Sequence, residues 1–396
     1  MSDPWLTIIG IGEDGAAGLG DASRDALATA RVVFGGPRHL ELADVGARGR
    51  PWPVPFDIAP VLALRGQRVA VLASGDPFWF GAGGSLAAHL EPAEWRALPA
   101  PGTLSLAAAR LGWRLEDCVT LGLHAAPFQQ LRPHLRRGCR IIATLRDREA
   151  PAALARWLCD QGAGNLRMTM LERLGGSAER IQTARAQDFV PTGIRAPVAV
   201  AMDGADLPRG FGLSAAPGRP DALFAHHGQI TKAPIRALTL AALAPRPGEV
   251  LWDIGGGSGS ISVEWALAGG RATCIEPRTD RLALIRANVE NFGLDARIRV
   301  IEGAAPGALA GLPEPDAVFV GGGASAQLFD ALWPRLPAGA RLVANAVTLE
   351  TEALLVRLQS RHGGTLVRLD VAQAAPLGGL RGWQPLRPVV QWSTVR

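Results

Sequence analysis

The stretch EVLWDIGGGSGSISVEWALAGGRATCIEP, from Glu249 to Pro277, decides the fold of the second half of this 396-residue chain. It opens with a short apolar run, 250–254, whose β-branched ends are typical of a buried strand. Three glycines at alternate positions follow it: Gly255, Gly257 and Gly259. A helical pattern begins at Ser260, and a second strand ends near Glu276. This order predicts a parallel strand–helix–strand unit whose glycine loop and helix N-terminus bind a cofactor at the carboxyl edge of the sheet.

Two acids in this stretch favour S-adenosylmethionine (SAM) as that cofactor. Asp253 stands two residues before the first glycine, where it can hold the methionine ammonium group or a water beneath it. Glu276 ends the second strand, where the two ribose hydroxyls would lie. A dinucleotide loop would place a third glycine or an alanine at Ser260 and would not require Asp253. The alternatives are an NAD site, which Glu276 also suits, and a glycine turn without a ligand.

The composition indicates a globular chain of two or three domains, because 396 residues exceed one ordinary core and 48% are hydrophobic. Forty of the 41 basic residues are arginines, since Lys232 is the single lysine. Arginine binds carboxylates in a bidentate manner, so an acidic small-molecule ligand is expected. The chain carries a formal charge of +5, but no long basic run and no basic–aromatic strip occurs. We therefore expect no nucleic-acid partner.

The cysteines and the N-terminal sequence point to the cytoplasm. Four scattered cysteines show neither a CxxC pair nor a histidine at zinc-ligand spacing: Cys118, Cys139, Cys159 and Cys274. They predict no metal and a reducing compartment. The sequence MSDPWLTIIGIGEDG lacks a basic segment before its apolar stretch, and no uncharged apolar run reaches membrane-spanning length. No membrane association is expected.

A second glycine loop at the start of the chain predicts a second cofactor domain. Residues 6–9 form a predicted strand, and Gly10, Gly12 and Gly15 follow it in GIGEDG. Strand and helix patterns then alternate, which predicts parallel sheets covered by helices. Periodicity is lost in a segment rich in Gly, Pro and Ala near residues 203–228. The predicted organisation is a domain at 1–205 that divides near Gly112, a linker at 206–225 and a domain at 226–396.

The first domain resembles the tetrapyrrole methylase family over about residues 5–205. The resemblance rests on GIGEDG, on SGDPFWFG from Ser74 to Gly81, and on PGTLSLAAARLGW, which begins about 25 residues later. The proline after Asp76 stiffens a tight turn at the end of a buried strand. Membership implies two αβα subdomains with SAM in the cleft between them. The expected cofactor residues are Gly10, Gly12, Ser74, Gly75, Asp76 and Ser105.

The second domain is similar to a different class, the decarboxylating precorrin methyltransferases, and implies a Rossmann-like, doubly wound SAM methyltransferase domain. Beyond the opening stretch, the resemblance rests on GQITKAPIR (228–236), VFVGGG (318–323) and NAVTLET (345–351). Both domains in this order resemble the fused precorrin C5,15-methyltransferases of cobalamin biosynthesis. That resemblance implies methylation of carbon 5 by the first domain, and methylation of carbon 15 with decarboxylation of the ring C acetate by the second. The implied product is precorrin-8.

The resemblance also suggests residues around the second site. We expect Asn345 and Lys232 to act in catalysis, as contacts to the reacting acetate or ring and to a substrate carboxylate. Thr231 either caps the helix beside it or contacts SAM. Arg278 is the preferred substrate-binding arginine, and the other candidates are Arg38, Arg381 and Arg387. His39, His124, His226 and His227 are weaker acid–base candidates.

One position departs from the pattern of the family. After the strand ending at Glu302 the family has GDAP, whereas this chain has Gly303, Ala304, Ala305 and Pro306. Gly303 and Ala304 are still expected beside the cofactor, but Ala304 cannot bind the adenine amino group with its side chain. Adenine recognition then requires backbone groups or another residue.

Two other functions compete with this interpretation. One is a SAM-dependent methyltransferase of RNA or of another small molecule, with an inactive N-terminal unit. The other is a SAM sensor without enzymatic activity. The number of motifs at the expected spacing disfavours the sensor, and the missing basic–aromatic surface disfavours RNA. Relatives of each unit suggest a homo-oligomer, either a dimer or a tetramer.

Overall fold

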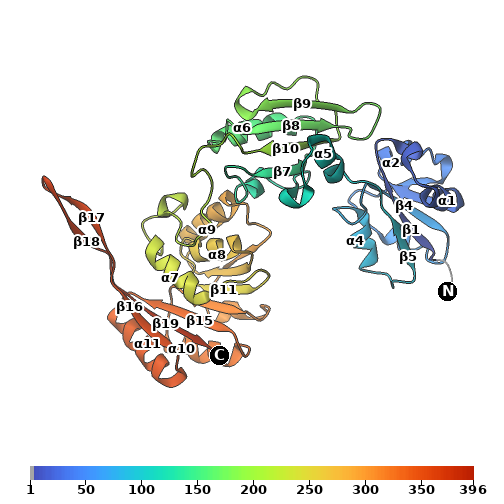
Figure 1. The fold of residues 1–396 in the computed structure, drawn as a ribbon. Helices are drawn as coiled ribbons and strands as arrows, with labels where there is room; N and C mark the ends of the chain where they lie inside the picture. Colours follow the sequence, from blue (N-terminus) through green and yellow to red (C-terminus); the bar gives the residue numbers. More distant parts are fainter. Residues whose placement is uncertain (1–3) are drawn as a thin grey trace. The chain divides into compact units, whose positions relative to one another are not determined.

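The computed structural model describes residues 4–396 and divides into two compact units (Figure 1). The first unit runs to Phe128 and continues over His134–Phe211, while the second consists of Gln129–Pro133 and Gly212–Arg396. The first three residues of the predicted domain 1–205 lie outside the described residues. The change of unit falls within the predicted linker, 206–225. The second half of that segment packs on the second unit, where Arg219 is buried.

The first unit begins with a five-stranded parallel sheet in the order β3-β2-β4-β1-β5. Its strands are β1 (Leu6–Ile11), β2 (Val32–Gly35), β3 (Gly49–Pro51), β4 (Val69–Ser74) and β5 (Trp95–Leu98). Its helices are α1 (Asp21–Thr29), α2 (Pro37–Leu42), α3 (Ala59–Leu62) and α4 (Ala82–Ala87). Every residue of β1 is buried, as expected for a parallel strand covered on both faces. Ile9 packs with α1 and Ile8 packs with α3 and α4, because successive side chains of a strand point to opposite faces.

The second sheet of this unit has the order β6-β7-β10-β8-β9. Its strands are β6 (Val119–Gly122), β7 (Arg140–Thr144), β8 (Arg167–Glu172), β9 (Arg180–Arg185) and β10 (Val198–Asp203), and its helices are α5 (Thr103–Leu111) and α6 (Ala150–Asp160). Only β6 and β7 are parallel, and the other three pairs are antiparallel. The prediction of parallel sheets throughout was therefore wrong here.

The position of helix α5 also shows that the division between the two sheets lies earlier in the chain than predicted. Its Ala107 and Ala108 pack against Ile142 of β7, so the helix covers the second sheet. The chain therefore passes from one sheet to the other before Thr103, earlier than the predicted division near Gly112.

The second unit is a seven-stranded sheet with helices on both faces, in the order β13-β12-β11-β14-β15-β19-β16. Its strands are β11 (Val250–Ile254), β12 (Arg271–Glu276), β13 (Ile298–Glu302), β14 (Ala317–Val320), β15 (Arg341–Ala346), β16 (Thr365–Leu369) and β19 (Val389–Val395). Its helices are α7 (Ala233–Leu243), α8 (Ser260–Leu267), α9 (Thr279–Asn291), α10 (Ala326–Leu332) and α11 (Leu349–His362). The five strands β11 to β15 are parallel, and β19 is antiparallel to β15. This confirms the predicted doubly wound domain.

The two faces of this sheet carry separate cores. Helices α7, α8 and α9 bury Leu240, Trp265 and Ile285 on one face. Helices α10 and α11 bury Phe329 and Leu355 on the other face. The carboxyl ends of β11, β12 and β14 thus open at one edge, where the glycine loop lies.

Two strands stand apart from the seven-stranded sheet. β17 (Ala372–Leu377) and β18 (Leu380–Pro385) form a separate antiparallel hairpin, which projects from its unit in Figure 1. The remaining elements are short 3-10 helices at 15–18, 46–48, 115–117, 128–131, 186–188, 221–223, 307–309 and 333–335.

Candidate functional site

In the first unit, three loops meet so closely at the carboxyl edge of the sheet that Gly10 has no room for a side chain. A Cβ atom on Gly10 would lie 1.9 Å from the carbonyl oxygen of Gly75 and 2.5 Å from the amide nitrogen of Ala100. The Gly75 amide donates to the Ile11 carbonyl at 3.0 Å, and its carbonyl accepts from Ala100 at 3.0 Å. The loops after β1, β4 and β5 are therefore tied together by their backbones, which brings the two predicted glycines into contact.

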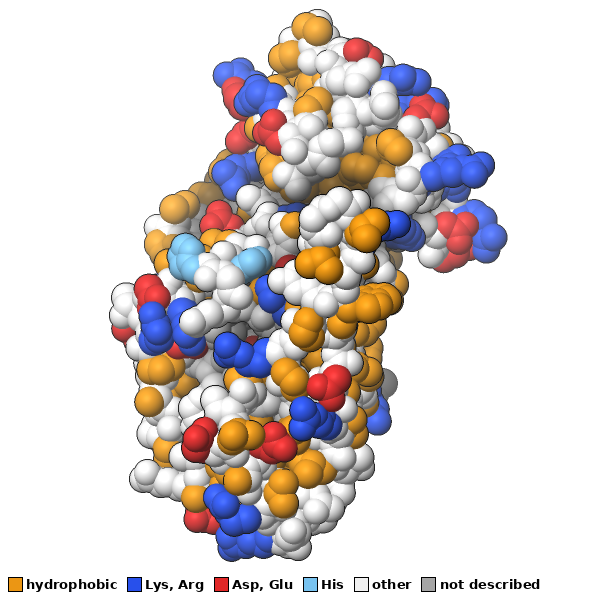
Figure 2. All heavy atoms as spheres, turned by 90° about the vertical axis from the view of Figure 1, so that its left-hand side faces the viewer, with side chains coloured by type: hydrophobic (Ala, Val, Ile, Leu, Met, Phe, Trp, Pro, Cys, Tyr) orange, Lys and Arg blue, Asp and Glu red, His pale blue; other side chains and the backbone are white. Residues whose placement is uncertain are grey.

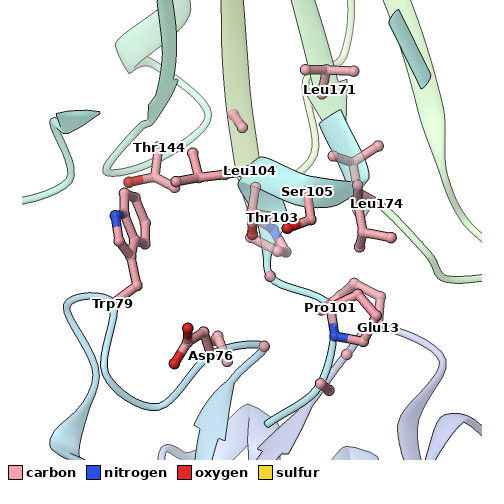
Figure 3. A pocket seen from close by; sticks show the side chains of 18 of the residues that line it. Glu13, Asp76, Trp79, Pro101, Thr103, Leu104, Ser105, Thr144, Leu171 and Leu174 are labelled. Atoms are coloured by element: carbon pink, nitrogen blue, oxygen red, sulfur yellow. The ribbon is translucent and has the colours of Figure 1, made fainter. Parts of the chain in front are cut away.

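A cavity of about 570 Å³ lies between the two sheets of this unit. Of the six predicted cofactor residues, five line it, namely Gly12, Ser74, Gly75, Asp76 and Ser105, and Gly10 packs against Gly75 behind this wall. Figure 3 shows Asp76 and Trp79 facing the first turn of α5, where Thr103 and Ser105 lie. The predicted stiff turn is present, because Asp76 Oδ1 accepts from the Phe78 amide at 2.9 Å. The sequence thus identified residues on both sides of the cavity, since Ser105 lies on α5 and the other four lie at or just after the ends of strands of the first sheet.

Several other residues of the cavity were not among the predicted cofactor residues. Thr144, at the end of β7, lies 3.0 Å from His124 Nδ1 through its hydroxyl. His39 Nε2 lies 2.8 Å from Ser74 Oγ. Glu13 and Arg38 form an ion pair on the same cavity. These residues come from strands and helices distant in the sequence, and only the fold brings them together.

In the second unit, the glycine loop between β11 and α8 leaves an open backbone surface. A Cβ atom on Gly255 would lie 2.6 Å from the Gly322 carbonyl oxygen, so the loops after β11 and β14 touch through their backbones. At Gly257, by contrast, a Cβ atom would meet nothing closer than 4.0 Å. Gly259 precedes the first residue of α8. The loop therefore has room for a ligand beside Gly257.

Asp253 lies beneath this loop with one carboxylate oxygen unused. The side chain is 1% exposed, and Oδ2 accepts from the Ser262 amide at 3.2 Å and from the Ser262 hydroxyl at 2.6 Å. Oδ1 is buried without a hydrogen-bond partner. Burial raises the pKa of Asp253 to about 6, although the bonds from Ser262 act in the opposite direction. A cationic or hydrogen-bond-donating group near Oδ1 would stabilise the charged form, which fits an ammonium group or a water between them.

Glu276 is held between the loop and the start of α9. Its Oε2 accepts from the Gly257 amide at 2.9 Å, and its Oε1 accepts from the Arg278 amide at 3.2 Å. The acid is buried at the end of β12, next to β11, as predicted. It fixes the loop directly, in addition to the role expected toward ribose hydroxyls.

The residues predicted around this site have protein partners of their own. Asn345 lies within β15, where Nδ2 donates to Thr239 Oγ1 at 2.9 Å and Oδ1 accepts from Gln391 Nε2 at 3.0 Å. Both halves of its amide are used to join α7, β15 and β19. These contacts favour a structural role over the predicted contact to the substrate.

Thr231 does not cap α7, so that alternative was wrong. The capping position is Lys232, and no side-chain hydrogen bond caps the helix. Lys232 Nζ lies 3.6 Å from Asp221, and its side chain is partly exposed. Arg278 pairs with Asp280 at 2.9 Å and is more than half exposed.

The departure at Ala304 is visible in the loop after β13. Ala304 is exposed, and its methyl group offers no hydrogen bond. The neighbouring Gly303 amide donates to the Glu276 carbonyl at 3.2 Å. Gly303 therefore ties this loop to the end of β12.

A buried group of charges, missed in the sequence, holds the segment before α7 against α8. Glu264 accepts from Arg236 Nε at 2.7 Å and from the backbone amides of Gly218 and Arg219 at 2.8 and 3.0 Å. Arg236 is completely buried and also pairs with Asp221 at 3.1 Å. The arginine of the GQITKAPIR motif thus has a structural role.

The described part of the chain offers neither a cluster of metal ligands nor a membrane-spanning helix. Within residues 4–396, no group of three or more His, Cys, Asp or Glu side chains could hold a metal ion. No helix in the same range is long and apolar enough to cross a membrane. On the face shown in Figure 2, basic and acidic side chains are interspersed, without one continuous basic patch.

Comparisons with known proteins agree with the two-unit architecture. A family model described as Tetrapyrrole (Corrin/Porphyrin) Methylases matches residues 6–190, and one described as Precorrin methyltransferase domain matches residues 222–396. A solved structure of the C-terminal domain of precorrin-6Y C5,15-methyltransferase from Rhodobacter capsulatus is 63% identical and covers 46% of this chain and 100% of its own, with a TM-score of 0.46.

Two relatives match over nearly the whole length. Precorrin-6Y C(5,15)-methyltransferase [decarboxylating] from a Sinorhizobium species is 49% identical over 98% of this chain and 96% of its own. The protein of that name from Mycobacterium tuberculosis (strain CDC 1551 / Oshkosh) is 40% identical over 99% of this chain and 100% of its own. The chain therefore belongs to the family of decarboxylating precorrin-6Y C(5,15)-methyltransferases.

Proposed function

We propose that this chain methylates a precorrin at carbons 5 and 15 and removes the ring C acetate carboxylate, giving precorrin-8 in cobalamin biosynthesis. The observation that carries the proposal is the presence of two separate glycine-loop sites, each at the carboxyl edge of a parallel sheet. We assign carbon 5 to the first unit, and carbon 15 with the decarboxylation to the second. The full-length similarity to relatives of that name supports both activities in one chain.

The proposal includes one SAM site in each unit. In the first, the walls formed by Gly12, Asp76 and Ser105 fit a polar cofactor. In the second, the unpartnered Asp253 Oδ1 and the open space at Gly257 fit an ammonium group beside a loop. Bound SAM supplies a methyl group on a positively charged sulfur, which is already an activated electrophile, so the proposal includes no metal ion.

The residues of each site act mainly by holding the reactants in line. Correct orientation of two reactants can contribute several kcal/mol, at best about 7 to 11. The partly exposed Lys232 and Arg278 are proposed to bind substrate carboxylates. Asn345 is proposed to position α7 against β15 and β19 through its two amide bonds. In the second unit, the transfer therefore depends on proximity and charge rather than on a strong base.

A mass measurement with the full-length protein tests the assignment of the two units. Wild-type protein with precorrin-6Y and SAM should add two methyl groups and remove one carbon dioxide. Gly10→Val should add one methyl group only and still remove carbon dioxide, because its Cβ atom would overlap the Gly75 carbonyl. Gly20→Val is the matched control, since no atom lies within 4 Å of a Cβ there. An unchanged substrate mass with wild-type protein would favour the RNA or other small-molecule alternative. If the Gly10→Val variant still adds two methyl groups, the first unit does not methylate carbon 5.

We also propose a homo-oligomer, either a dimer or a tetramer, with the hairpin β17–β18 in the interface. Leu377, Leu380 and Trp383 are 70%, 80% and 77% exposed on this hairpin. An isolated two-stranded hairpin is only marginally stable in water, so a partner that covers these side chains would stabilise it. A second copy of the chain offers the same hairpin edge for antiparallel pairing.

The molar mass in solution checks this proposal. Wild-type protein should have the mass of a dimer or a tetramer by light scattering. The double variant Leu380→Glu/Trp383→Glu should shift to a smaller species. Leu349→Glu is the control, since Leu349 is 79% exposed in the first turn of α11. A monomeric wild type, or an oligomer unchanged in the double variant, would contradict the interface.

The proposed location is the cytoplasm. Its support is chemical: Cys118, Cys139, Cys159 and Cys274 are all free thiols. Unpaired cysteines are typical of reducing compartments.

A further inference from the structure

The two proposed methylations differ in what neutralises the ring after the methyl group has been added. Each transfer breaks a carbon–sulfur bond, with its electron pair going to sulfur, and leaves one positive charge on the macrocycle. At carbon 15, loss of carbon dioxide returns an electron pair to the ring and removes that charge. At carbon 5 no carboxylate leaves, so the charge is removed only if carbon 5 gives up its proton. The first unit therefore needs a proton acceptor that the second does not.

The cavity of the first unit contains a histidine–serine pair suited to this task. His39 lies on α2, and Ser74 is the last residue of β4. His39 Nε2 lies 2.8 Å from Ser74 Oγ, and both residues line the cavity. Ser74 is exposed, whereas His39 Nδ1 is buried and has no protein partner. Nε2 is thus the ring nitrogen that points toward the cavity, and a proton from the cavity reaches it through the Ser74 hydroxyl.

We propose that Ser74 and His39 together accept the proton of carbon 5 after methyl transfer. The carbon–hydrogen electron pair returns to the ring, and the proton passes to Ser74 Oγ while the serine hydroxyl proton passes to His39 Nε2. The products are the neutral methylated ring and an imidazolium, which later releases its proton to water. This inference rests on the proposed methylation of carbon 5 by the first unit. Under this inference Ser74 contacts the substrate rather than the cofactor, the role predicted from the sequence.

The electrostatic surroundings keep His39 ready to accept a proton. Burial, together with the positive charge of Arg38, lowers the pKa of His39 below its usual value, so the imidazole is neutral at neutral pH. The charged or titratable groups on α2, on the elements packed against it and around the cavity are Glu13, Arg38, Glu41, Arg50, Asp76 and His124. Of these, His124 is the other candidate acceptor, but its Nδ1 is engaged with Thr144 and its ring packs edge-on against Phe80.

The test uses the full-length protein with precorrin-6Y and SAM, and follows the two methylations separately by mass spectrometry. His39→Gln keeps a polar group beside Ser74 but cannot take up the proton. It should slow carbon 5 methylation by about 100-fold or more, the usual effect of losing a general base. Carbon 15 methylation and decarboxylation, measured in the same sample, should change less than about twofold. Ser74→Ala should show the same selective loss.

A pH profile separates proton transfer from a structural role. In wild-type protein, carbon 5 methylation should fall as the pH drops through the pKa of His39, and this acidic limb should be missing from the residual rate of His39→Gln. His89→Gln is the control, because His89 is exposed on the surface and does not line the cavity. The proposal is overturned if both His39→Gln and Ser74→Ala methylate carbon 5 at the wild-type rate, or if only His124→Gln removes that activity. Failure of the unit assignment is seen separately, as two methyl groups added by Gly10→Val.

Discussion

Replacing Asp253 with asparagine should abolish carbon 15 methylation and decarboxylation together, and at pH 8 it should stabilise the protein without SAM. The two reactions should fail together because both follow from one methyl transfer at the second site. The stabilisation has a different cause. Asp253 is buried with Oδ1 unpartnered, so its charge is costly until a ligand lies beside it. The same carboxylate thus lowers stability and prepares the site for a cation.

The pH dependence of this effect has a definite direction. Burial raises the pKa of Asp253 from 3.8 to about 6 in the folded chain. A rise of this size corresponds to about 3 kcal/mol between the protonated and the charged forms. The protonated carboxyl is favourable for folding below the unfolded value, and this contribution is lost as the pH rises through about 6. Asparagine carries no charge at any pH, so the variant should gain stability over wild type between pH 4 and pH 8.

Thermal unfolding without SAM at pH 4 and at pH 8, together with the mass assay, checks both halves of this prediction. The gain at pH 8 should stay below about 3 kcal/mol, because the new amide nitrogen also lacks a partner. Asp295→Asn is the control on the same unit, since Asp295 is exposed. Normal carbon 15 methylation in Asp253→Asn would refute the site assignment. A stability difference that is the same at both pH values would show that burial of the charge is not its cause.

The sequence identified the parts of both sites that are encoded locally. A glycine loop directly after an apolar strand fixes where the sheet edge opens, so Gly10 and Gly255 could be placed from spacing, whereas Gly75 followed from the resemblance to the tetrapyrrole methylases. The same reasoning predicted Asp253 and Glu276, the two acids at or near strand ends. These features depend on a few neighbouring residues, and the fold adds little to them.

Other features depend on which distant elements meet. Strand and helix alternation looks the same whether the strands pair parallel or antiparallel, and this is why the sheet β6–β10 was predicted wrongly. Asn345 looked available because its partners, Thr239 and Gln391, lie on α7 and β19. The pairing of His39 with Ser74 likewise requires α2 to pack beside β4. No local pattern contains that information.

Replacing Glu264 with glutamine should destabilise the second unit by about 3 to 5 kcal/mol, the usual cost of breaking a buried ion pair by removing one of its charges. Arg236 is completely buried, and Glu264 accepts its Nε at 2.7 Å. Glutamine fills nearly the same volume but brings an NH2 group toward the donors of Arg236, Gly218 and Arg219. The result is a loss of charge compensation and a clash of donors at one point.

Calorimetry should show the transition of the second unit shifted down by on the order of 10 °C, as expected for a domain of this size. Glu290→Gln on α9 is the matched control, because Glu290 is exposed. A double-mutant cycle with Arg236→Met separates the ion pair from the other bonds of Glu264. The double variant should be less destabilised than the sum of the single variants by roughly 0.5 to 3 kcal/mol, since the first change already removes the partner of the second. Full additivity would mean that Glu264 stabilises the unit through its bonds to Gly218 and Arg219, including the Arg219 guanidinium at 3.3 Å, rather than through Arg236.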